Sequence, residues 1–388
     1  MQVTTAALLA IAEVRSRVAE ETYLATGLDY SRPTMITGTV NERCNYRCPM
    51  CEYWRPELHR AEELTIPEWQ NALTGLRQFL GRYVIAFLGG EPFIKSGFLD
   101  LLDFCREHGI DYTTTTNGSI LLRGDTIERL VRSPPLHLNI SVDGPTPEVH
   151  DRSRGVPGSL RKIERAIQSI RNEQERIGVR FPIRIKPTMH AWNFRDMPAM
   201  VDWVRRVGAD TVDFEPVRHW TPEVDRDLWI GSEQHDELRT VSATLVAQKR
   251  GGAPIETSEH RLLGMVDHFA DRKVEPEVVP CRVGLRRLSI APNGDVTTCW
   301  FFDPIGNVRN NNAREIWTSA VARKRREETV ACDKACAYSC MAQKPFKNLV
   351  ERGRLLLAAS RKILVRPADS DTVIAAPEVA ELPQPSVP

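Results

Sequence analysis

The sequence predicts an α/β protein built on a parallel sheet, because strand-like and helix-like stretches alternate six times before residue 216. Repeated strand–helix units require parallel strands joined by right-handed crossovers. This pattern fits either a doubly wound sheet or an incomplete barrel, and periodicity alone does not separate them. A cysteine-rich segment after residue 280 adds a second, smaller domain.

The expected strands are apolar or threonine-rich runs at residues 35–40, 83–88, 110–115, 136–142, 183–188 and 211–215. The helices between them carry clear signals. Thr65 and Glu68 form a capping box, and Gly109 is a typical helix stop. The helix that opens at Ser159 carries apolar residues at helical spacing, namely Ile163, Ala166, Ile167 and Ile170.

The remaining organisation follows from composition and turn chemistry. We expect an N-terminal helix and connector at 1–33, the βα core at 34–219, and a helical bridge at 220–280. A compact unit at 281–345 contains a β-hairpin (288–290 and 296–298) around Asn293-Gly294. A basic amphipathic helix at 346–366 precedes a tail at 367–388, whose proline-, alanine- and acid-rich composition predicts disorder.

Composition excludes several function classes. Lys and Arg total 52 and Asp and Glu total 51, so net charge gives no case for nucleic acid or an anionic membrane. No run of about 20 apolar residues predicts a membrane span. Residues 6–12 are apolar but lack the basic flank of a signal peptide. We therefore expect a cytoplasmic protein, in which nine cysteines indicate metal ligands rather than disulfides.

Three cysteines, Cys44, Cys48 and Cys51, follow the first strand within eight residues. Converging thiolates select iron–sulfur clusters or zinc. Zinc would need a fourth ligand nearby, and the next cysteine, Cys105, lies on an apolar helix face where a buried core thiol is expected. A cubane held by three protein thiolates leaves one iron open to a small molecule.

This C-x3-C-x2-C spacing resembles that of the radical S-adenosylmethionine (radical SAM) enzymes. The resemblance implies a partial (β/α)6 TIM-like barrel and a [4Fe–4S] cluster whose open iron chelates SAM. It also implies reductive cleavage of SAM to a 5′-deoxyadenosyl radical, with electrons from a flavodoxin- or ferredoxin-type partner. Gly89-Gly90-Glu91 after the second strand is similar to the family's GGE motif, which holds the amino group of SAM.

The resemblance carries further SAM contacts onto this chain. Asn117 closes the third strand, and Ser141 and Asp143 close the fourth, where Asp143 is a candidate acceptor for ribose hydroxyls. In the loop after Asp143, Arg154 is the candidate for the SAM carboxylate, with a solvated basic loop as the alternative. The residue before the third family cysteine is commonly aromatic and packs on adenine; here it is Met50, with Tyr46 nearby.

Charged residues at the ends of the last two strands are candidates for catalysis or substrate binding. Lys186 and Glu215 would face one cavity if the barrel forms, because charged groups on apolar strands are costly to bury without a purpose. Pairing with each other is the alternative. Asp303 is a candidate base for the substrate radical, with a hairpin-end salt bridge as its alternative.

The second cysteine group resembles the SPASM/twitch extension of radical SAM enzymes. It comprises Cys281, Cys299, Cys332, Cys336 and Cys340. Five cysteines fall short of the two-cluster pattern, so the resemblance implies one auxiliary [4Fe–4S] cluster. Cys281, Cys299 and Cys340 are the expected ligands, with either Cys336 or Cys332 as the fourth. A zinc ribbon is the competing interpretation.

The expected function is a radical SAM oxidoreductase that dehydrogenates or epimerises a small polar natural-product intermediate, such as a sugar or aminocyclitol. The alternative is a maturase of a ribosomally synthesised peptide, acting by side-chain cross-linking or epimerisation. Only a helix and a connector precede the first strand, where peptide maturases often carry a leader-binding domain, although a separate leader-binding partner would supply one. A non-enzymatic metal-binding scaffold is a distant third hypothesis.

Overall fold

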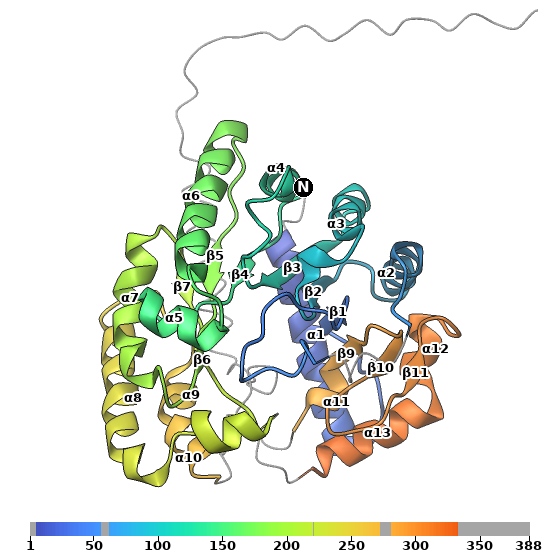
Figure 1. The fold of residues 1–388 in the computed structure, drawn as a ribbon. Helices are drawn as coiled ribbons and strands as arrows, with labels where there is room; N and C mark the ends of the chain where they lie inside the picture. The colour runs from blue at the N-terminus through green and yellow to red at the C-terminus, as the bar shows by residue number, and fades with distance from the viewer. Residues whose placement is uncertain (1–4, 56–61, 220, 272–280, 333–388) are drawn as a thin grey trace, which may run out of the picture. The chain divides into compact units, whose positions relative to one another are not determined.

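The computed structural model describes residues 5–55, 62–219, 221–271 and 281–332, with side chains from residue 11 onward. These residues belong to one unit within Met1–Pro345. A sheet of nine strands runs through it in the order β11-β10-β9-β1-β2-β3-β4-β5-β7 (Figure 1). The expected helix at 346–366 and tail at 367–388 lie outside the described residues.

The parallel part of the sheet confirms the predicted α/β class and the six βα units. Its strands pair in chain order from β1 to β5 and then β7, all parallel. The strands of this part of the sheet are β1 (Met35–Thr39), β2 (Val84–Leu88), β3 (Asp111–Thr116), β4 (Leu138–Ile140), β5 (Ile183–Ile185) and β7 (Thr211–Val212), and two short strands outside it are β6 (Thr188–Met189) and β8 (Glu215–Pro216).

Among the helices, those that connect β1 to β2, β2 to β3 and β3 to β4 lie along the outer side of the sheet (Figure 1). The helices are α1 (Thr5–Thr26), α2 (Ile66–Leu80), α3 (Phe98–Glu107), α4 (Thr126–Arg132), α5 (Pro147–Arg154), α6 (Ser159–Ile177), α7 (Met197–Arg206), α8 (His235–Arg250), α9 (Glu259–Leu263) and α10 (Met265–Phe269). Short 3₁₀ turns lie at Pro92–Ile94, Phe194–Asp196 and Ser232–Gln234, and a π turn at Val224–Leu228.

The helices form with the end structures and the buried face that the sequence predicts. The Thr65 hydroxyl accepts from the Glu68 N–H, and the Glu68 carboxylate accepts from the Thr65 N–H at 2.7 Å, which completes the capping box of α2. Gly109 follows α3 with φ of 58°. The predicted apolar face of α6 is buried throughout. These signals fix where the outer helices begin and end.

The fifth and sixth strands are each divided. The expected strand 183–188 is β5 followed by β6, and 211–215 is β7 followed by β8, with β6 and β8 pairing as a separate two-stranded sheet. Pro187 lies at the break and has no N–H to continue the ladder. The divided strands carry Lys186 and Asp213 at their breaks.

The cysteine-rich unit extends the barrel sheet. The predicted hairpin forms as β9 (Arg287–Ile290) and β10 (Asp295–Thr297), and β10 pairs with β11 (Gly306–Asn307). β9 lies parallel to β1, with Met35 opposite Arg287 and Gly38 opposite Ile290. Up to residue 332, where the description of this unit ends, it also contains the helices α11 (Val283–Arg286), α12 (Ala313–Thr318) and α13 (Ala320–Val330).

The two faces of the sheet differ in character. A side chain at Gly38 would meet the buried Trp69 of α2 at 3.0 Å, so this face of β1 packs on the helices. Thr37 points the other way, where its hydroxyl lies 2.6 Å from that of Ser289 on β9. Polar side chains therefore gather on the face opposite the helices, which we call the concave face. Among the residues that the structure describes, no helix is long and apolar enough to cross a bilayer.

Candidate active site

The three-cysteine loop is anchored by an unusually close approach between two backbone segments. A Cβ on Gly90 would lie 2.1 Å from the Arg43 carbonyl oxygen and 2.9 Å from the Cys44 nitrogen. The Gly90 N–H donates to the Asn41 carbonyl at 3.1 Å, and the Glu91 N–H donates to the Arg43 carbonyl at 2.9 Å. Only glycine permits this contact, which fixes Cys44 at the end of β2.

Glu91 is buried beneath this contact. Its carboxylate accepts hydrogen bonds from the Asn117 N–H (2.7 Å), the Thr116 hydroxyl (2.8 Å) and the Phe93 N–H (3.1 Å). Burial raises the pKa of Glu91 to about 7 in spite of these donors. The structure thus places Glu91 as a link between the ends of β2 and β3, and its predicted contact with the SAM amino group stays a prediction.

The three thiols lie close together and are largely withdrawn from solvent. Burial, with a smaller contribution of the same sign from the neighbouring Cys48, raises the pKa of Cys44 to about 11 and that of Cys51 to about 12. Cys44 Sγ accepts from the Tyr46 N–H at 3.4 Å and from the Asn117 amide at 3.6 Å. Buried thiolates need a compensating cation, and metal binding supplies one as it displaces the protons.

This donor set fits an iron–sulfur cluster. Within the described ranges, no three Cys, His, Asp or Glu side chains converge on one point tightly enough to hold a single metal ion. In a cubane each protein thiolate binds a different iron, so a cluster places a different demand on the loop. Cys44, Cys48 and Cys51 would hold the cluster, and the bound cluster would supply the electron that cleaves SAM.

Several predicted SAM contacts surround this loop. Asn117 touches it directly, through Cys44 and through the Asn45 side chain at 3.1 Å. Tyr46 and Met50 are buried, and burial raises the pKa of the Tyr46 phenol to about 12. Ser141 is half-buried, and its backbone N–H donates to the Thr116 carbonyl at 2.9 Å. Their contacts with SAM stay predictions.

The structure joins two residues that the sequence left separate. Arg154 Nε lies 2.7 Å from Asp143 Oδ2, and Arg154 Nη2 lies 2.8 Å from Oδ1. Asp143 was predicted to accept from the SAM ribose and Arg154 to bind its carboxylate. The observed geometry pairs them with each other beside Cys48, and neither SAM contact is tested by it.

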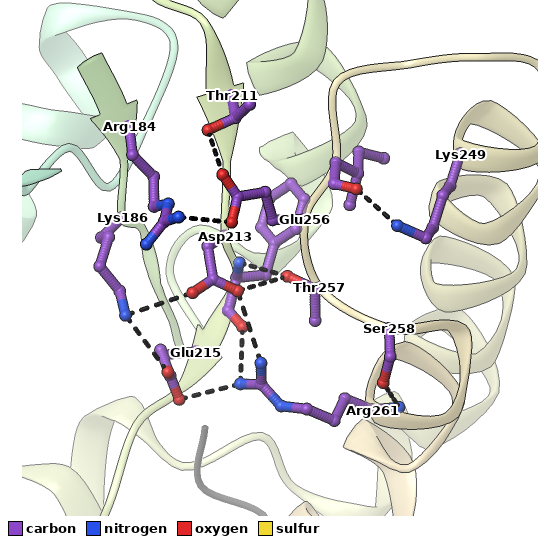
Figure 2. A network of polar contacts seen from close by, with 12 residues as sticks. Arg184, Lys186, Thr211, Asp213, Glu215, Lys249, Glu256, Thr257, Ser258 and Arg261 are labelled. Carbon is purple, nitrogen blue, oxygen red and sulfur yellow. Dashed lines mark hydrogen bonds and ion pairs between the residues drawn. The ribbon is translucent and has the colours of Figure 1, made fainter. Parts of the chain in front are cut away.

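Lys186 and Glu215 lie on the concave face and form an ion pair at 3.4 Å (Figure 2). This is the pairing that the sequence left open as the alternative to substrate binding. Two residues missing from the prediction complete the network. Asp213 lies 3.3 Å from Lys186, and Arg261 contacts Asp213 at 3.4 Å and Glu215 at 3.0 Å.

Electrostatics hold this network in its charged form. Burial opposes the charge on Lys186, but Glu215 and Asp213 outweigh it and raise the Lys186 pKa. Burial likewise opposes the charge on Asp213, while Lys186 and Arg261 lower its pKa to about 2. Asp213 was detectable in the sequence because it stands two residues before Glu215, on the same side of the chain. Arg261 comes from α9 and carries no such signal.

The second cysteine group is described in part. Cys299 is buried, and Cys281 and Cys332 are half-buried, whereas Cys336 and Cys340 lie outside the described residues. Asp303 is exposed and pairs with Arg325 at 3.4 Å, and its role as a base stays a prediction. Cys105 is fully buried in the core, which confirms the expectation that it is a core thiol.

The protein is thus an α/β protein with a parallel, partial barrel. The three thiols that follow its first strand could bind an iron–sulfur cluster. Residues 39–189 match the model of the radical SAM superfamily, and residues 281–341 match that of an iron–sulfur cluster-binding domain, SPASM. The two matches together span more than half of the chain. The chain belongs to the radical SAM enzymes with a C-terminal SPASM domain, which use SAM, a SAM-binding cluster and an auxiliary cluster.

Curated relatives match over most of their length. An AdoMet-dependent heme synthase of Methanosarcina barkeri is 23% identical and covers 76% of this chain and 85% of its own. A PqqA peptide cyclase of Rhodopseudomonas palustris is 26% identical over 79% of each chain. A heme synthase of Oleidesulfovibrio alaskensis is 29% identical over 73% of this chain and 74% of its own.

Solved structures share the fold at low identity. Streptococcus suis SuiB bound to S-adenosylmethionine has a TM-score of 0.62 at 17% identity, covering 80% of this chain and 72% of SuiB. SuiB bound to its precursor peptide SuiA has a TM-score of 0.60 at 15% identity, over 87% and 77%. The enzyme anSMEcpe with bound AdoMet and a peptide has a TM-score of 0.56 at 14% identity, over 85% and 100%.

Replacing Gly90 should disable the cluster loop. In Gly90→Ala the added methyl would collide with the Arg43 backbone, which cannot move without displacing Cys44. After anaerobic reconstitution we expect this variant to bind about four irons fewer per chain than the wild type. Gly75→Ala in α2 is the control, because its Cβ meets no atom within 4 Å and alanine favours helix. Undiminished iron in Gly90→Ala would contradict the proposed anchoring.

Glu91 should make stability depend on pH. The pKa of Glu91 is about 7 in the folded protein, whereas the ordinary value for a glutamate is 4.5. The folded state therefore binds this proton more tightly than the unfolded state does. The contribution of Glu91 to the unfolding free energy should therefore be fully present below pH 4.5 and fall by roughly 3 kcal/mol as the pH rises to about 7. Urea unfolding of the metal-free protein checks this, with Glu91→Gln as reference. If wild type and Glu91→Gln share one pH slope, Glu91 is not the group responsible.

Proposed function

We propose that this enzyme modifies a peptide substrate by oxidising a side chain, with cross-linking as the outcome. The similarity to a peptide cyclase along nearly four-fifths of both chains carries the proposal. It favours the peptide alternative over the sugar or aminocyclitol that the sequence analysis preferred. The fold shared with structures that hold peptide substrates is consistent with it.

The concave face offers suitable polar groups for such a substrate. Lys186, Glu215, Asp213 and Arg261 form a charge-balanced network (Figure 2), in which Lys186 and Glu215 are half-buried and Asp213 is buried. Such a network can exchange an internal ion pair for hydrogen bonds to the amide or carboxylate groups of a peptide. We assign Lys186 and Glu215 to substrate binding on this basis.

When bound, SAM and the clusters would supply abstraction of one hydrogen atom and acceptance of one electron, and the loss of a proton as well leaves the substrate two hydrogens short. The chain itself must receive the proton that is lost. Glu215 is our candidate for this role, because its side chain is half-buried on the concave face and has Lys186 and Arg261 as counter-charges. We also expect a flavodoxin- or ferredoxin-type reductant and a cytoplasmic location.

A tetrapyrrole is the second candidate substrate, because two of the relatives described above are heme synthases. A peptide and an iron porphyrin make different demands on the same face. The porphyrin needs a broad apolar surface, whereas the peptide needs distributed polar partners. The charged network described here favours the peptide.

Co-expression tests the proposal directly. Each short peptide encoded beside the gene is produced together with the enzyme and analysed by mass spectrometry. We expect one peptide to lose two hydrogens, and to remain unmodified with Cys44→Ala. Cys105→Ala, which alters only a core thiol, should retain the modification. If no peptide changes while an iron porphyrin or an aminocyclitol is oxidised by the purified enzyme, the peptide assignment is wrong.

A further inference from the structure

Arg154 closes α5 and brings a buried positive charge to the cluster loop. Its guanidinium forms a two-point contact with Asp143, which is fully buried, at 2.7 and 2.8 Å. The Cys48 thiol donates to the carbonyl oxygen of Arg154 at 3.7 Å, and the Arg154 guanidinium lies close enough for its charge to favour the thiolate form of Cys48. The backbone of Arg154 therefore contacts a cluster cysteine, and the positive charge of the same residue acts on that sulfur.

These contacts change in meaning once Cys48 binds iron. A metal-bound cysteine is a thiolate, so it has no proton to donate to the Arg154 carbonyl. The negative end of that carbonyl dipole then faces a negative sulfur. The guanidinium of the same residue offsets this repulsion, because it presents N–H donors and a positive charge to the sulfur.

Asp143 is held rigidly opposite this charge. Its Oδ1 accepts from the Thr188 N–H at 2.8 Å, its own N–H donates to His150 Nδ1 at 3.1 Å, and its carbonyl accepts from the Asn193 amide at 2.9 Å. The buried His150 adds no charge, because burial and the nearby Arg154 lower its pKa to about 3. The two charges next to Cys48 are thus fixed in place and opposite in sign.

We propose that Arg154 and Asp143 form an electrostatic couple that sets the reduction potential of the cluster held by Cys48. Reduction adds one negative charge to a cluster, and its potential responds to nearby charge and to hydrogen bonds on its sulfurs. Arg154 favours the reduced form, whereas Asp143 opposes it. This proposal does not depend on which substrate the enzyme modifies. The two residues act on the cluster through their charges and take no direct part in the reaction.

Potentiometric titration of the reconstituted enzyme without SAM or substrate, followed by EPR of the reduced cluster, tests this. Arg154→Gln should shift the midpoint potential downward, and Asp143→Asn should shift it upward. The double variant restores the net charge and should return close to the wild-type potential. A purely structural role predicts no such opposite signs, because both single variants would disturb the loop in the same way.

Charge-preserving variants serve as matched controls. Arg154→Lys and Asp143→Glu keep both charges while altering geometry, and both should stay near the wild-type potential. If either neutral variant fails to hold a cluster, the charge-preserving variants still test the proposal. A potential close to that of the wild type supports it, and a large shift contradicts it. Shifts of the same sign in the two neutral variants, no shift in either, or large shifts in the charge-preserving pair would each overturn the proposal.

Discussion

The close approach of the backbone at residues 41–44 to Gly89 and Gly90 is the constraint on which this site depends. β1 and β2 end side by side, and the two glycines let the chain leaving β1 cross directly over the end of β2. Two backbone hydrogen bonds then fix Cys44 at the carboxyl edge of the sheet, where α/β proteins bind their ligands. Without this contact, three cysteines of suitable spacing would have no fixed position.

Buried charge near this edge is accommodated by pairing rather than by solvent. Glu91 is satisfied by three donors, Asp143 by Arg154, and Lys186 by two carboxylates. Burying a charge without a partner is costly, so these groups must stay paired in the folded protein. The partners of each group come from different elements. The same pairs connect β2 to β3, β4 to α5, and β5 to the segment around β8 and α9. Electrostatics and fold are therefore coupled at the site.

Local signals in the sequence predicted much of the fold. The capping box of α2, the apolar face of α6 and the Asn-Gly turn of the hairpin depend on residues close together in the chain, and all formed. The breaks between β5 and β6 and between β7 and β8 were missed, although Pro187 marks the first of them. The parallel pairing of β9 with β1 joins segments some 250 residues apart, and no local pattern encodes it.

Site residues that belong to a sequence motif could be predicted. Residues that meet only through a contact in the folded chain could not. Cys44, Gly90 and Glu91 were singled out because their spacing is distinctive, and the structure brings them together at the ends of β1 and β2. The pairing of Asp143 with Arg154 was missed, because both residues were assigned to an external cofactor and not to each other. Arg261 was missed because it reaches the concave face from α9, and single charged residues on helices are usually solvated.

The most direct test of the central claim is anaerobic reconstitution with iron and sulfide, followed by reduction in the presence of SAM. Two cubane clusters predict about eight irons per chain and formation of 5′-deoxyadenosine. Replacing Cys44, Cys48 and Cys51 together by alanine should lower iron to about four and abolish 5′-deoxyadenosine. Deoxyadenosine formed by that triple variant would contradict the account, because the three thiols at the end of β1 would then not hold the cluster that cleaves SAM.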